Sequence, residues 1–387
     1  PYVPDYLISM IRASAQLGRK RTAYHYMLQL QQQGLSYDFN TWDETASMRG
    51  TEAYEYINKL MIEAGQPSGN GSPVFDLNLA PGDLGDVDWD ESRQRFLVGT
   101  RSEGKLLAVD DSGNAETLLE ANGSNGLWAI EGLAVDEKNN NLWIASSASP
   151  AFNSFSPADA NKGALFQFEL DTLAFKARYG IPQDGLPHSL GGIAFTENGE
   201  VYVVDRAVPI IYSKPVQGEM LQRYGGSREL VALTDIAVTP DNSRVFVADA
   251  VMGVLAIDPR AKRMVMLEAP ENVNLSGIYG IEFTGQELVV TQSGISPQRL
   301  ASLKLDAAGA AVEFIVPMAT ALEEFDTPGV GTIRGDNMFY FSNHGTSTAT
   351  QSLHFMATPL DSGTEVKTPE MRLFEQSVKE QEEKSQQ

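Results

Sequence analysis

Hydrophobic and polar residues alternate over short distances in the stretch LTDIAVTPDNSRVFVADA, which runs from Leu233 to Ala250. The polar segment Thr239-Pro240-Asp241-Asn242-Ser243 separates two runs rich in β-branched and aromatic residues. Alternation with a period of two is typical of half-buried strands, and Pro, Asp and Asn favour turns. The stretch therefore predicts a β-hairpin.

The same hairpin pattern recurs along most of the chain. Its other copies are LGDVDWDESRQRFLVGT, IEGLAVDEKNNNLWIAS, LGGIAFTENGEVYVVD, YGIEFTGQELVVTQ and the weaker VGTIRGDNMFYFSN. Equivalent positions in the six copies are Trp89, Val135, Phe195, Val238, Phe283 and Ile333. Repeats that lie about 43 to 60 residues apart, most of them followed by a third strand, suit the four-stranded blades of a β-propeller. We therefore predict a mainly β fold, a six-bladed β-propeller.

The segment before the first copy has a different periodicity. DYLISMIRASAQLG places Leu7, Met10, Ile11 and Leu17 on one helical stripe, and two further helical patterns end at Gly34 and Gly65. Thr41 to Glu44 has the form of a capping box for the last of these helices. We expect an N-terminal α-helical module whose apolar stripe packs either on the rim of the propeller or on a partner protein.

These patterns divide the chain into four parts. The predicted parts are a helical module (1–65), a linker (66–73), the propeller (74–361) and a charged C-terminal tail (362–387). The segment SPVFDLNL has no place in a blade of its own, so we expect it to form the outermost strand of the last blade. Such closure removes exposed sheet edges.

Composition narrows the possible partners. The formal net charge of −22 argues against nucleic acid and anionic membranes, because both require concentrated positive charge. The absence of cysteine excludes disulfides and thiolate chemistry, and no apolar run reaches the roughly 18 residues of a transmembrane helix. Composition leaves open a protein partner or a small-molecule ligand, and the candidate site described below suggests a small lactone or ester as that ligand.

In a propeller, the start of the first strand and the end of the second strand of each blade lie on the same face, near the axis. Five acidic residues occupy such positions: Asp86, Glu131, Asp205, Asp235 and Asp249. Oxygen ligands of this kind suit Ca²⁺ or Mg²⁺. The alternative is that these carboxylates cap turns by accepting backbone amides.

Two histidines fall on the same face. His188 or His344 could act as a general base on a metal-polarised ester or lactone, and the alternative for each is an ordinary hydrogen-bonding role. We expect the rim of the pit to include Arg101, Ser146, Arg206, Gln292 and Asn343. The insertion at 146–163, with Phe152 and Phe155, is either a lid over this pit or a disordered bulge.

The copies LTDIAVTPDNSRVFVADAVMGVLAIDP and LGGIAFTENGEVYVVD resemble the six-bladed propellers of the SMP-30/gluconolactonase/strictosidine synthase group, and more loosely NHL and YVTN repeats. The resemblance implies a central divalent cation, held by a Glu, an Asn and an Asp, and hydrolysis of lactones or esters. In this chain Glu131 stands where the group has its Asn, Asp235 follows the equivalent Thr234, and Gly85 and Asp86 stand where the group has its Glu. The implied ligand set is thus displaced or lost.

Our leading hypothesis from the sequence is therefore a non-catalytic binding or scaffold protein of the bacterial cell envelope. It would engage a partner through the axial face or the helical module. The alternative is a Ca²⁺-dependent lactonase or esterase in which Asp86, Glu131 and Asp235 hold the metal. We expect a periplasmic or secreted protein, with a cytoplasmic location still open, and the start at Pro1 suggests a leader removed by processing or trimming.

Overall fold

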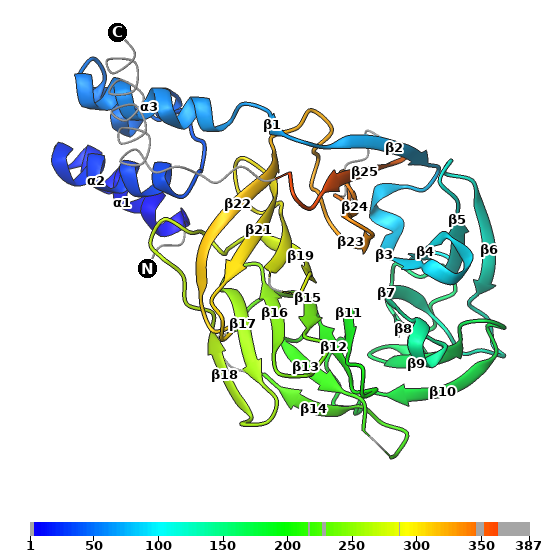
Figure 1. The fold of residues 1–387 in the computed structure, drawn as a ribbon. Helices are drawn as coiled ribbons and strands as arrows, with labels where there is room; N and C mark the ends of the chain where they lie inside the picture. The colour runs from blue at the N-terminus through cyan, green and yellow to red at the C-terminus, as the bar shows by residue number, and fades with distance from the viewer. Residues whose placement is uncertain (1–3, 216, 227–229, 286, 346–351, 363–387) are drawn as a thin grey trace, which may run out of the picture.

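The computed structural model describes residues 4–215, 217–226, 230–285, 287–345 and 352–362. Six antiparallel sheets are arranged around a common axis, and the first strand of each repeated hairpin lies nearest the centre of the ring (Figure 1). The predicted six-bladed β-propeller is confirmed. The charged tail lies outside the described residues except for Ser362.

Blades one to three follow the order of the chain. Their strands are β3 (Leu84–Asp90), β4 (Arg95–Thr100), β5 (Lys105–Val109) and β6 (Ala115–Glu120); β7 (Ala129–Asp136), β8 (Asn141–Ser147), β9 (Gly163–Glu169) and β10 (Phe175–Gly180); and β11 (Leu190–Phe195), β12 (Val201–Asp205), β13 (Ile210–Ser213) and β14 (Gln222–Gly225). Within each blade, every strand pairs with the next in sequence. Short turns join the first two strands of each of these blades, as the repeated hairpin requires.

Blades four to six continue around the ring. Their strands are β15 (Leu233–Val238), β16 (Val245–Asp249), β17 (Gly253–Asp258) and β18 (Arg263–Met266); β19 (Ile278–Phe283), β20 (Glu287–Gln292), β21 (Arg299–Leu305) and β22 (Val312–Thr320); and β23 (Gly331–Arg334), β24 (Asn337–Phe341) and β25 (Leu353–Pro359). Apolar clusters fill the space between neighbouring blades. Each blade thus buries its two faces against its neighbours.

The ring closes through an early strand. β2 (Ser72–Leu77) pairs antiparallel with β25 and is the outermost strand of blade six, as the sequence predicted. Phe75 of β2 stacks on Phe355 of β25 with ring centroids 4.8 Å apart. Just before β2, the expected linker contains β1 (Ser68–Gly69), which pairs with β22 as a fifth strand of blade five.

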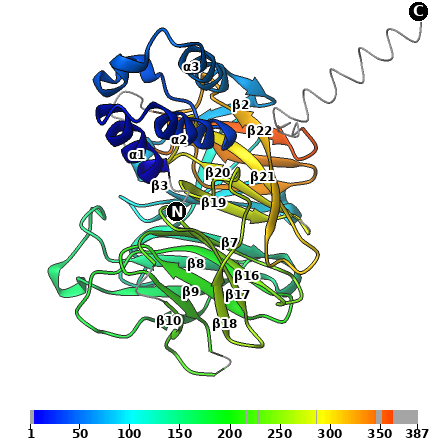
Figure 2. The ribbon, with the colours of Figure 1, turned by 90° about the vertical axis from the view of Figure 1, so that its left-hand side faces the viewer.

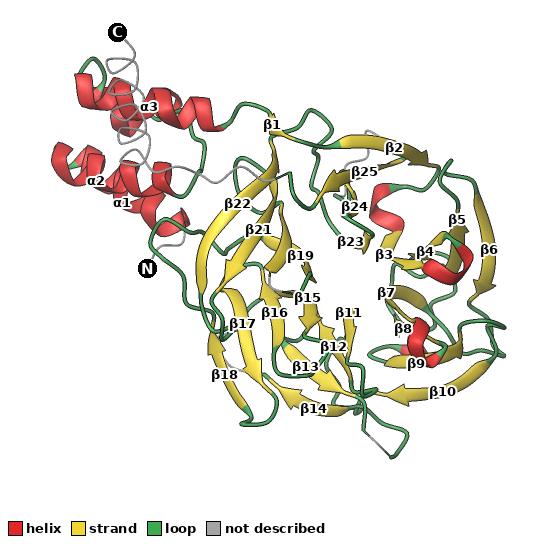
Figure 3. Cartoon of the chain, viewed as in Figure 1, coloured by secondary structure: helices red, strands yellow, loops and turns green. Residues whose placement is uncertain are grey.

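The helices α1 (Pro4–Gln16), α2 (Lys20–Gln32) and α3 (Glu52–Ala64) lie beside blade five, in front of the ring in Figure 2 and red in Figure 3. Leu7 and Ile11 are buried in a cluster of the module that also includes Ile295 of the propeller. Met10 and Leu17, expected on the buried stripe, are 43% and 67% exposed. The buried side of α1 is centred between positions 7, 11, 14 and 15, so Met10 lies at its margin, and Leu17 follows the end of the helix.

The start of the third helix also differs from the prediction. Asp38, not Thr41, caps the short 3-10 helix at Phe39–Thr41, and Glu44 lies in a second one at Asp43–Met48. α3 begins only after Thr51. Among the described residues, no helix has the length and apolar character needed to cross a bilayer.

Candidate functional site

The first strands of the blades present two layers of side chains to the axis. The lower layer lines a cavity of about 530 Å³ and consists of Asp88, Ala134, Ala194, Ala237, Glu282 and Thr332. The upper layer contains Asp86 of blade one and Asp235 of blade four, which belong to opposite blades and line the same cavity. We call this cavity the axial channel.

The channel carboxylates connect neighbouring blades. The backbone N–H of Leu133 in blade two donates to Oδ2 of Asp86 at 2.9 Å, and the N–H of Ile281 in blade five donates to Oδ2 of Asp235 at 3.0 Å. The inner edge of each first strand has no further strand to pair with, so its amides need other acceptors. Aspartates of the preceding blade provide them.

Asp88 repeats this arrangement one layer lower. The N–H of Val135 donates to its Oδ2 at 2.7 Å, and the hydroxyl of Thr332 donates to its Oδ1 at 2.8 Å. Asp88 thus joins blade one to blades two and six.

Burial is the main cause of the raised pKa values of the channel carboxylates. Burial, and then the charge of Asp235, raise the pKa of Asp86 to about 7, although the amide of Leu133 opposes this shift. Burial raises the pKa of Asp235 to about 6, and burial raises the pKa of Asp88 and Glu282 as well. Carboxylates that share a poorly solvated space retain protons to a higher pH, because each charge disfavours the next.

Above the channel lies what we call the upper mouth, formed by Arg101, Glu131, Arg206, Thr234 and His344. Each of the first five blades has a bulge at the start of its inner strand, where the register shifts. Glu131 and Thr234 are bulged residues of blades two and four. A bulge changes the direction of the side chain, which explains why Glu131 faces the arginines rather than a neighbouring strand.

Arg206 lies over the start of blade three. Its Nε donates to the carbonyl oxygen of Thr234 at 2.9 Å, and its Nη1 donates to that of Glu131 at 3.3 Å. A β-carbon at Gly191 would lie 2.2 Å from Nε, so only glycine leaves room for the guanidinium. Arg206 therefore joins the bulges of the two flanking blades.

Arg101 lies beside Arg206 and is less well paired. Its Nε is buried and has no hydrogen-bond acceptor among the described residues. Burial, and then the positive charge of Arg206, lower the pKa of Arg101, while Glu131 opposes this. Glu131 is itself 5% exposed and accepts a hydrogen bond from Ser189 Oγ at 2.9 Å.

His344 completes the upper mouth as a neutral group. Its Nε2 donates to the carbonyl oxygen of Leu84 at 3.3 Å, which leaves Nδ1 as an acceptor. Burial, and then the charges of Arg101 and Arg206, lower the pKa of His344 to about 3. A base of this strength takes up a proton poorly at neutral pH.

His188 lies apart from these residues and uses both ring nitrogens. Nδ1 is 2.5 Å from Oδ2 of Asp205, and Nε2 is 3.0 Å from Oδ1 of Asp184. Asp205 also accepts the backbone N–H groups of Ser189, Ala207 and Val208. This pair organises the loop after β12.

Asp249 has an equivalent place in blade four. It accepts four backbone N–H groups, from Val231, Ala232, Val251 and Met252. The geometry of Asp205 and Asp249 is that of turn-capping carboxylates.

The other expected rim residues have structural contacts. Ser146 Oγ accepts the N–H of Trp128, and Asn343 connects β24 to β25 through Ser352 and His354. Gln292 bonds to Asn274 and Ser276 and to Arg299 beneath the helical module. The structure thus brings Arg101, Arg206, Glu131 and His344 together, with Asp86 and Asp235 below them, and leaves the other residues elsewhere.

The insertion at 146–163 is packed against the propeller. Phe152 is 6% exposed and belongs to the apolar cluster between blades one and two. The N–H of Asn153 donates to the carbonyl oxygen of Ser102 at 2.8 Å. These contacts hold the insertion on blade one, so neither expected form, a lid or a disordered bulge, describes it.

The donors around the axis do not suit a calcium ion. Both oxygens of Asp86 and of Asp235 already accept backbone amides, and the charge of Arg206 acts on both carboxylates. Ca²⁺ requires six to eight oxygen ligands and is repelled by neighbouring guanidinium groups. In the part of the chain that the structure describes, no group of three His, Asp or Glu residues is placed to hold a metal.

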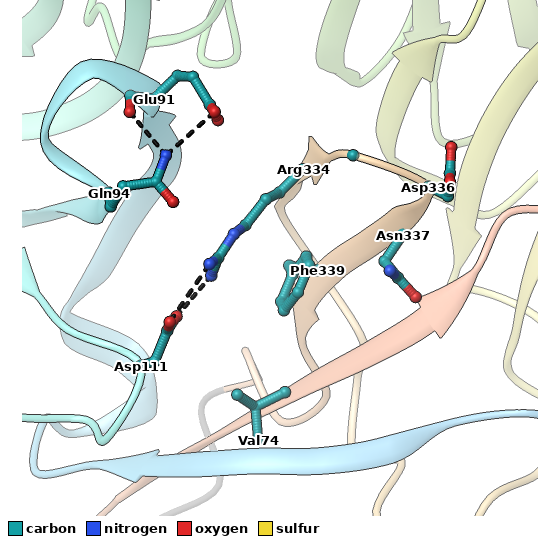
Figure 4. A pocket seen from close by; sticks show the side chains of 9 residues that line it. Val74, Glu91, Gln94, Asp111, Arg334, Asp336, Asn337 and Phe339 are labelled. Carbon is teal, nitrogen blue, oxygen red and sulfur yellow. Dashed lines mark hydrogen bonds and ion pairs between the residues drawn. The ribbon is translucent and has the colours of Figure 1, made fainter.

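A second cavity, of about 550 Å³, lies between blades six and one (Figure 4). Arg334 crosses it, with Nη1 2.5 Å and Nη2 3.2 Å from the two carboxylate oxygens of Asp111. Its guanidinium also lies 3.9 Å from the centre of the Trp89 ring. Arg334 is therefore neutralised and held in place, and it acts as a clamp between the two blades.

Sequence reasoning missed the lower axial layer. Asp88 lies two positions after Asp86 on the same strand, and Glu282 occupies the equivalent position in blade five. Alternation with period two places both on the axial side of their strands, so the repeat alignment contained the signal. We expected site residues only at the ends of the strands, and these positions do not include the second layer.

Comparison with known proteins supports the fold. No protein-family profile and no curated protein sequence matches the chain. Among solved structures, the PQQ-bound aldose sugar dehydrogenase of Streptomyces coelicolor is similar with a TM-score of 0.50 and 14% identity, over 76% of this chain and 99% of that one. At this identity the similarity concerns the fold alone.

Two further solved structures are less similar. A protein of unknown function from Bacteroides thetaiotaomicron has a TM-score of 0.49 and 12% identity, over 76% of each chain. A chain of a nidogen/laminin complex has a TM-score of 0.44 and 16% identity, over 58% of this chain and 77% of that one. Together, the structure and the similarity to the dehydrogenase identify the chain as a six-bladed β-propeller.

Proposed function

We propose that the protein is a non-catalytic binding protein of the bacterial cell envelope, periplasmic or secreted, that engages its partner through the upper axial face or the helical module. The observation that carries the proposal is the pair Arg101 and Arg206 at the upper mouth. These positive groups lie beside Asp86, Glu131 and Asp235, the carboxylates that a metal-dependent hydrolase would need as ligands, and they would repel a cation there. Such a mouth is suited to hold a ligand rather than to activate water.

The histidines support the same proposal. A general base needs a free nitrogen and a pKa near the working pH. Both nitrogens of His188 face carboxylates, and the pKa of His344 is lowered to about 3 by burial and by the two arginines. Neither has the properties of a base for lactone or ester hydrolysis.

The helical module offers a second contact surface. Tyr6, Met10 and Leu17 are 66%, 43% and 67% exposed. Tyr6 and Met10 lie four residues apart on one side of α1, and Leu17 follows directly after its end. Exposed apolar residues of this kind are typical of surfaces that bind other proteins.

The alternative is a Ca²⁺-dependent lactonase or esterase of the SMP-30/gluconolactonase type. The observation in its favour is that Asp86, Glu131 and Asp235 all lie close to Arg206 at the axis. In that enzyme these three residues would hold the ion, and His188 or His344 would be the base. The amides and guanidinium groups around the carboxylates favour the binding protein instead.

One experiment separates the two functions. Metal content and thermal unfolding are measured on the full chain before and after chelation and after return of Ca²⁺, together with hydrolysis of a panel of lactones and esters. We expect no stoichiometric metal, no change in Tm and no hydrolysis. A stoichiometric ion whose removal lowers Tm, with hydrolysis lost in the double variant Glu131→Gln, Asp235→Asn, would overturn the proposal.

A further inference from the structure

We propose that Arg101 and Arg206 form a binding site for a small organic carboxylate at the upper mouth. This inference rests on the proposed binding function and names the chemical class of the ligand. Its site consists of residues of blades one, two and three, at the upper end of the axial channel.

Two positive charges meet at the upper mouth. The guanidinium of Arg206 lies close enough to disfavour the charge of Arg101, and the carboxylates of Glu131 and Asp86 act on both arginines through their charge. The hydrogen bonds of Arg206 go to carbonyl oxygens, and among the described residues Arg101 Nε has no acceptor. A bound carboxylate would supply the direct acceptor that Arg101 Nε lacks among the described residues.

The carboxylates below use their oxygens on backbone amides. Asp86 and Asp235 direct their oxygens at amides of Val87 and Leu133, and of Ile236 and Ile281. They are thereby held to the strands of the channel wall. The guanidinium groups above them remain available to a ligand.

One hydrogen-bond donor of the pair is unsatisfied. A guanidinium has five N–H groups, and Nε of Arg101 is buried without an acceptor in the described part of the chain. Arg206 uses Nε and Nη1 on carbonyl oxygens. Buried donors are normally paired, and a carboxylate can accept two parallel N–H bonds from one guanidinium.

The overall charge limits the size of the anion. The chain carries a formal net charge of −22, so it repels polyanions at long range. A small ion with one or two carboxylates experiences less repulsion and reaches the paired arginines. Both side chains are only partly buried, so the upper mouth is open to solvent.

The test is calorimetric titration of the full chain with sodium malonate at constant ionic strength. We expect saturable binding that weakens about tenfold or more in Arg101→Gln and in Arg206→Gln. Arg101→Lys keeps the charge and loses the planar fork, so its affinity should lie between those of the wild type and Arg101→Gln. Arg263→Gln, on the exposed strand β18, is the matched control and should bind as the wild type does.

Several outcomes would overturn the inference. These are no binding of malonate, acetate or citrate by the wild type, unchanged binding in a folded Arg101→Gln variant, or tighter binding of phosphate than of malonate. Thermal unfolding of each variant shows whether it is folded. If malonate fails while the metal and hydrolysis assays stay negative, only the carboxylate site is wrong. Calcium-dependent hydrolysis would instead overturn the proposed function itself.

Discussion

The guanidinium of Arg206 occupies the space that a side chain at Gly191 would need, with Nε 2.2 Å from the position of a β-carbon there. Arg206 belongs to the loop after β12, and Gly191 to the bulged start of β11 in the same blade. The missing side chain thus allows an arginine to contact the carbonyl oxygens of two flanking blades.

Gly191→Ala should displace Arg206 rather than unfold the protein. The clashing atoms belong to a long, flexible side chain that can move away, so we expect a loss of about 1–2 kcal/mol in the free energy of unfolding, from the two lost hydrogen bonds. Adding Arg206→Ala should then cost little more, because both changes remove the same contacts. Urea unfolding of the two single variants and the double variant measures this.

Gly132→Ala is the matched control in blade two. Its β-carbon would lie 2.2 Å from the carbonyl oxygen of Gly191, a backbone atom that cannot move aside alone. We expect a larger loss of stability than for Gly191→Ala. Equal losses, or fully additive effects of Gly191→Ala and Arg206→Ala, would show that Arg206 is not held over Gly191.

The raised pKa of Asp86 predicts that the free energy of unfolding depends on pH. Burial and the charge of Asp235 raise its pKa to about 7 in the folded protein, so the folded state holds a proton that the unfolded state releases above about pH 4. The folded state therefore binds more protons between about pH 4 and pH 7, and its stability falls as pH rises through this range. This pKa shift corresponds to a loss of about 2–4 kcal/mol in the free energy of unfolding across the range.

Asp86→Asn removes this titration. In urea unfolding across the same pH range, the wild type should lose stability relative to Asp86→Asn as pH rises, and the difference should level off above about pH 7. Asp110→Asn is the control, because hydrogen bonds from Asn114 lower the pKa of the exposed Asp110 and its effect belongs to more acidic pH. Parallel pH profiles for the wild type and Asp86→Asn would contradict the prediction.

Because β2 closes the ring, a substitution in this outermost strand of blade six should strongly lower the free energy of unfolding. Phe75 of β2 is 9% exposed and stacks on Phe355, so Phe75→Ala should lower the free energy of unfolding by about 3 kcal/mol. Phe175 lies on β10, the outermost strand of blade two, and is 53% exposed. Phe175→Ala should therefore cost about 1 kcal/mol or less. Similar losses in denaturant unfolding would mean that β2 does not secure the ring.

The sequence predicts the fold in more detail than the site, because the fold depends on a local repeat and the site depends on contacts between blades. Each blade repeats the inner hairpin, so alternation around Val238 and Phe283 was enough to indicate the propeller and its closure. Asp86 and Asp235, which we expected near the axis, line the axial channel. Their partners, Leu133 and Ile281, belong to the next blade, so local pattern could not show that the carboxylates bind amides.

The arginines illustrate the same limit. The sequence placed Arg101 and Arg206 at the mouth of an acidic pit, which suggested a cation site. That Arg206 lies over Gly191 depends on the bulge in β11 and on carbonyl oxygens from two other blades. Three-dimensional contacts of this kind bring two arginines together at the upper mouth although the chain as a whole is strongly negative.

Arg299 connects the helical module to the propeller. It is 1% exposed, its Nε donates to Gln292 Oε1 at 2.7 Å, and its Nη1 donates to the carbonyl oxygen of Gln33 at 3.2 Å. Burial lowers its pKa to about 10. Next to it, the N–H of Ser36 donates to the carbonyl oxygen of Ser296 at 2.7 Å, a second link across the same interface.

Arg299→Met should loosen this interface while the propeller stays folded. The buried charge has no carboxylate partner in the described structure, so its removal relieves a desolvation cost that offsets part of the lost hydrogen bonds. The link to Gln33 is lost outright, and hydrogen exchange of the Ser36 amide should become about tenfold faster, equivalent to about 1.4 kcal/mol. Arg263→Met, on the exposed strand β18, should leave this exchange unchanged. If Ser36 exchanges at the same rate in Arg299→Met as in the wild type, other contacts hold the module and Arg299 serves blade five alone.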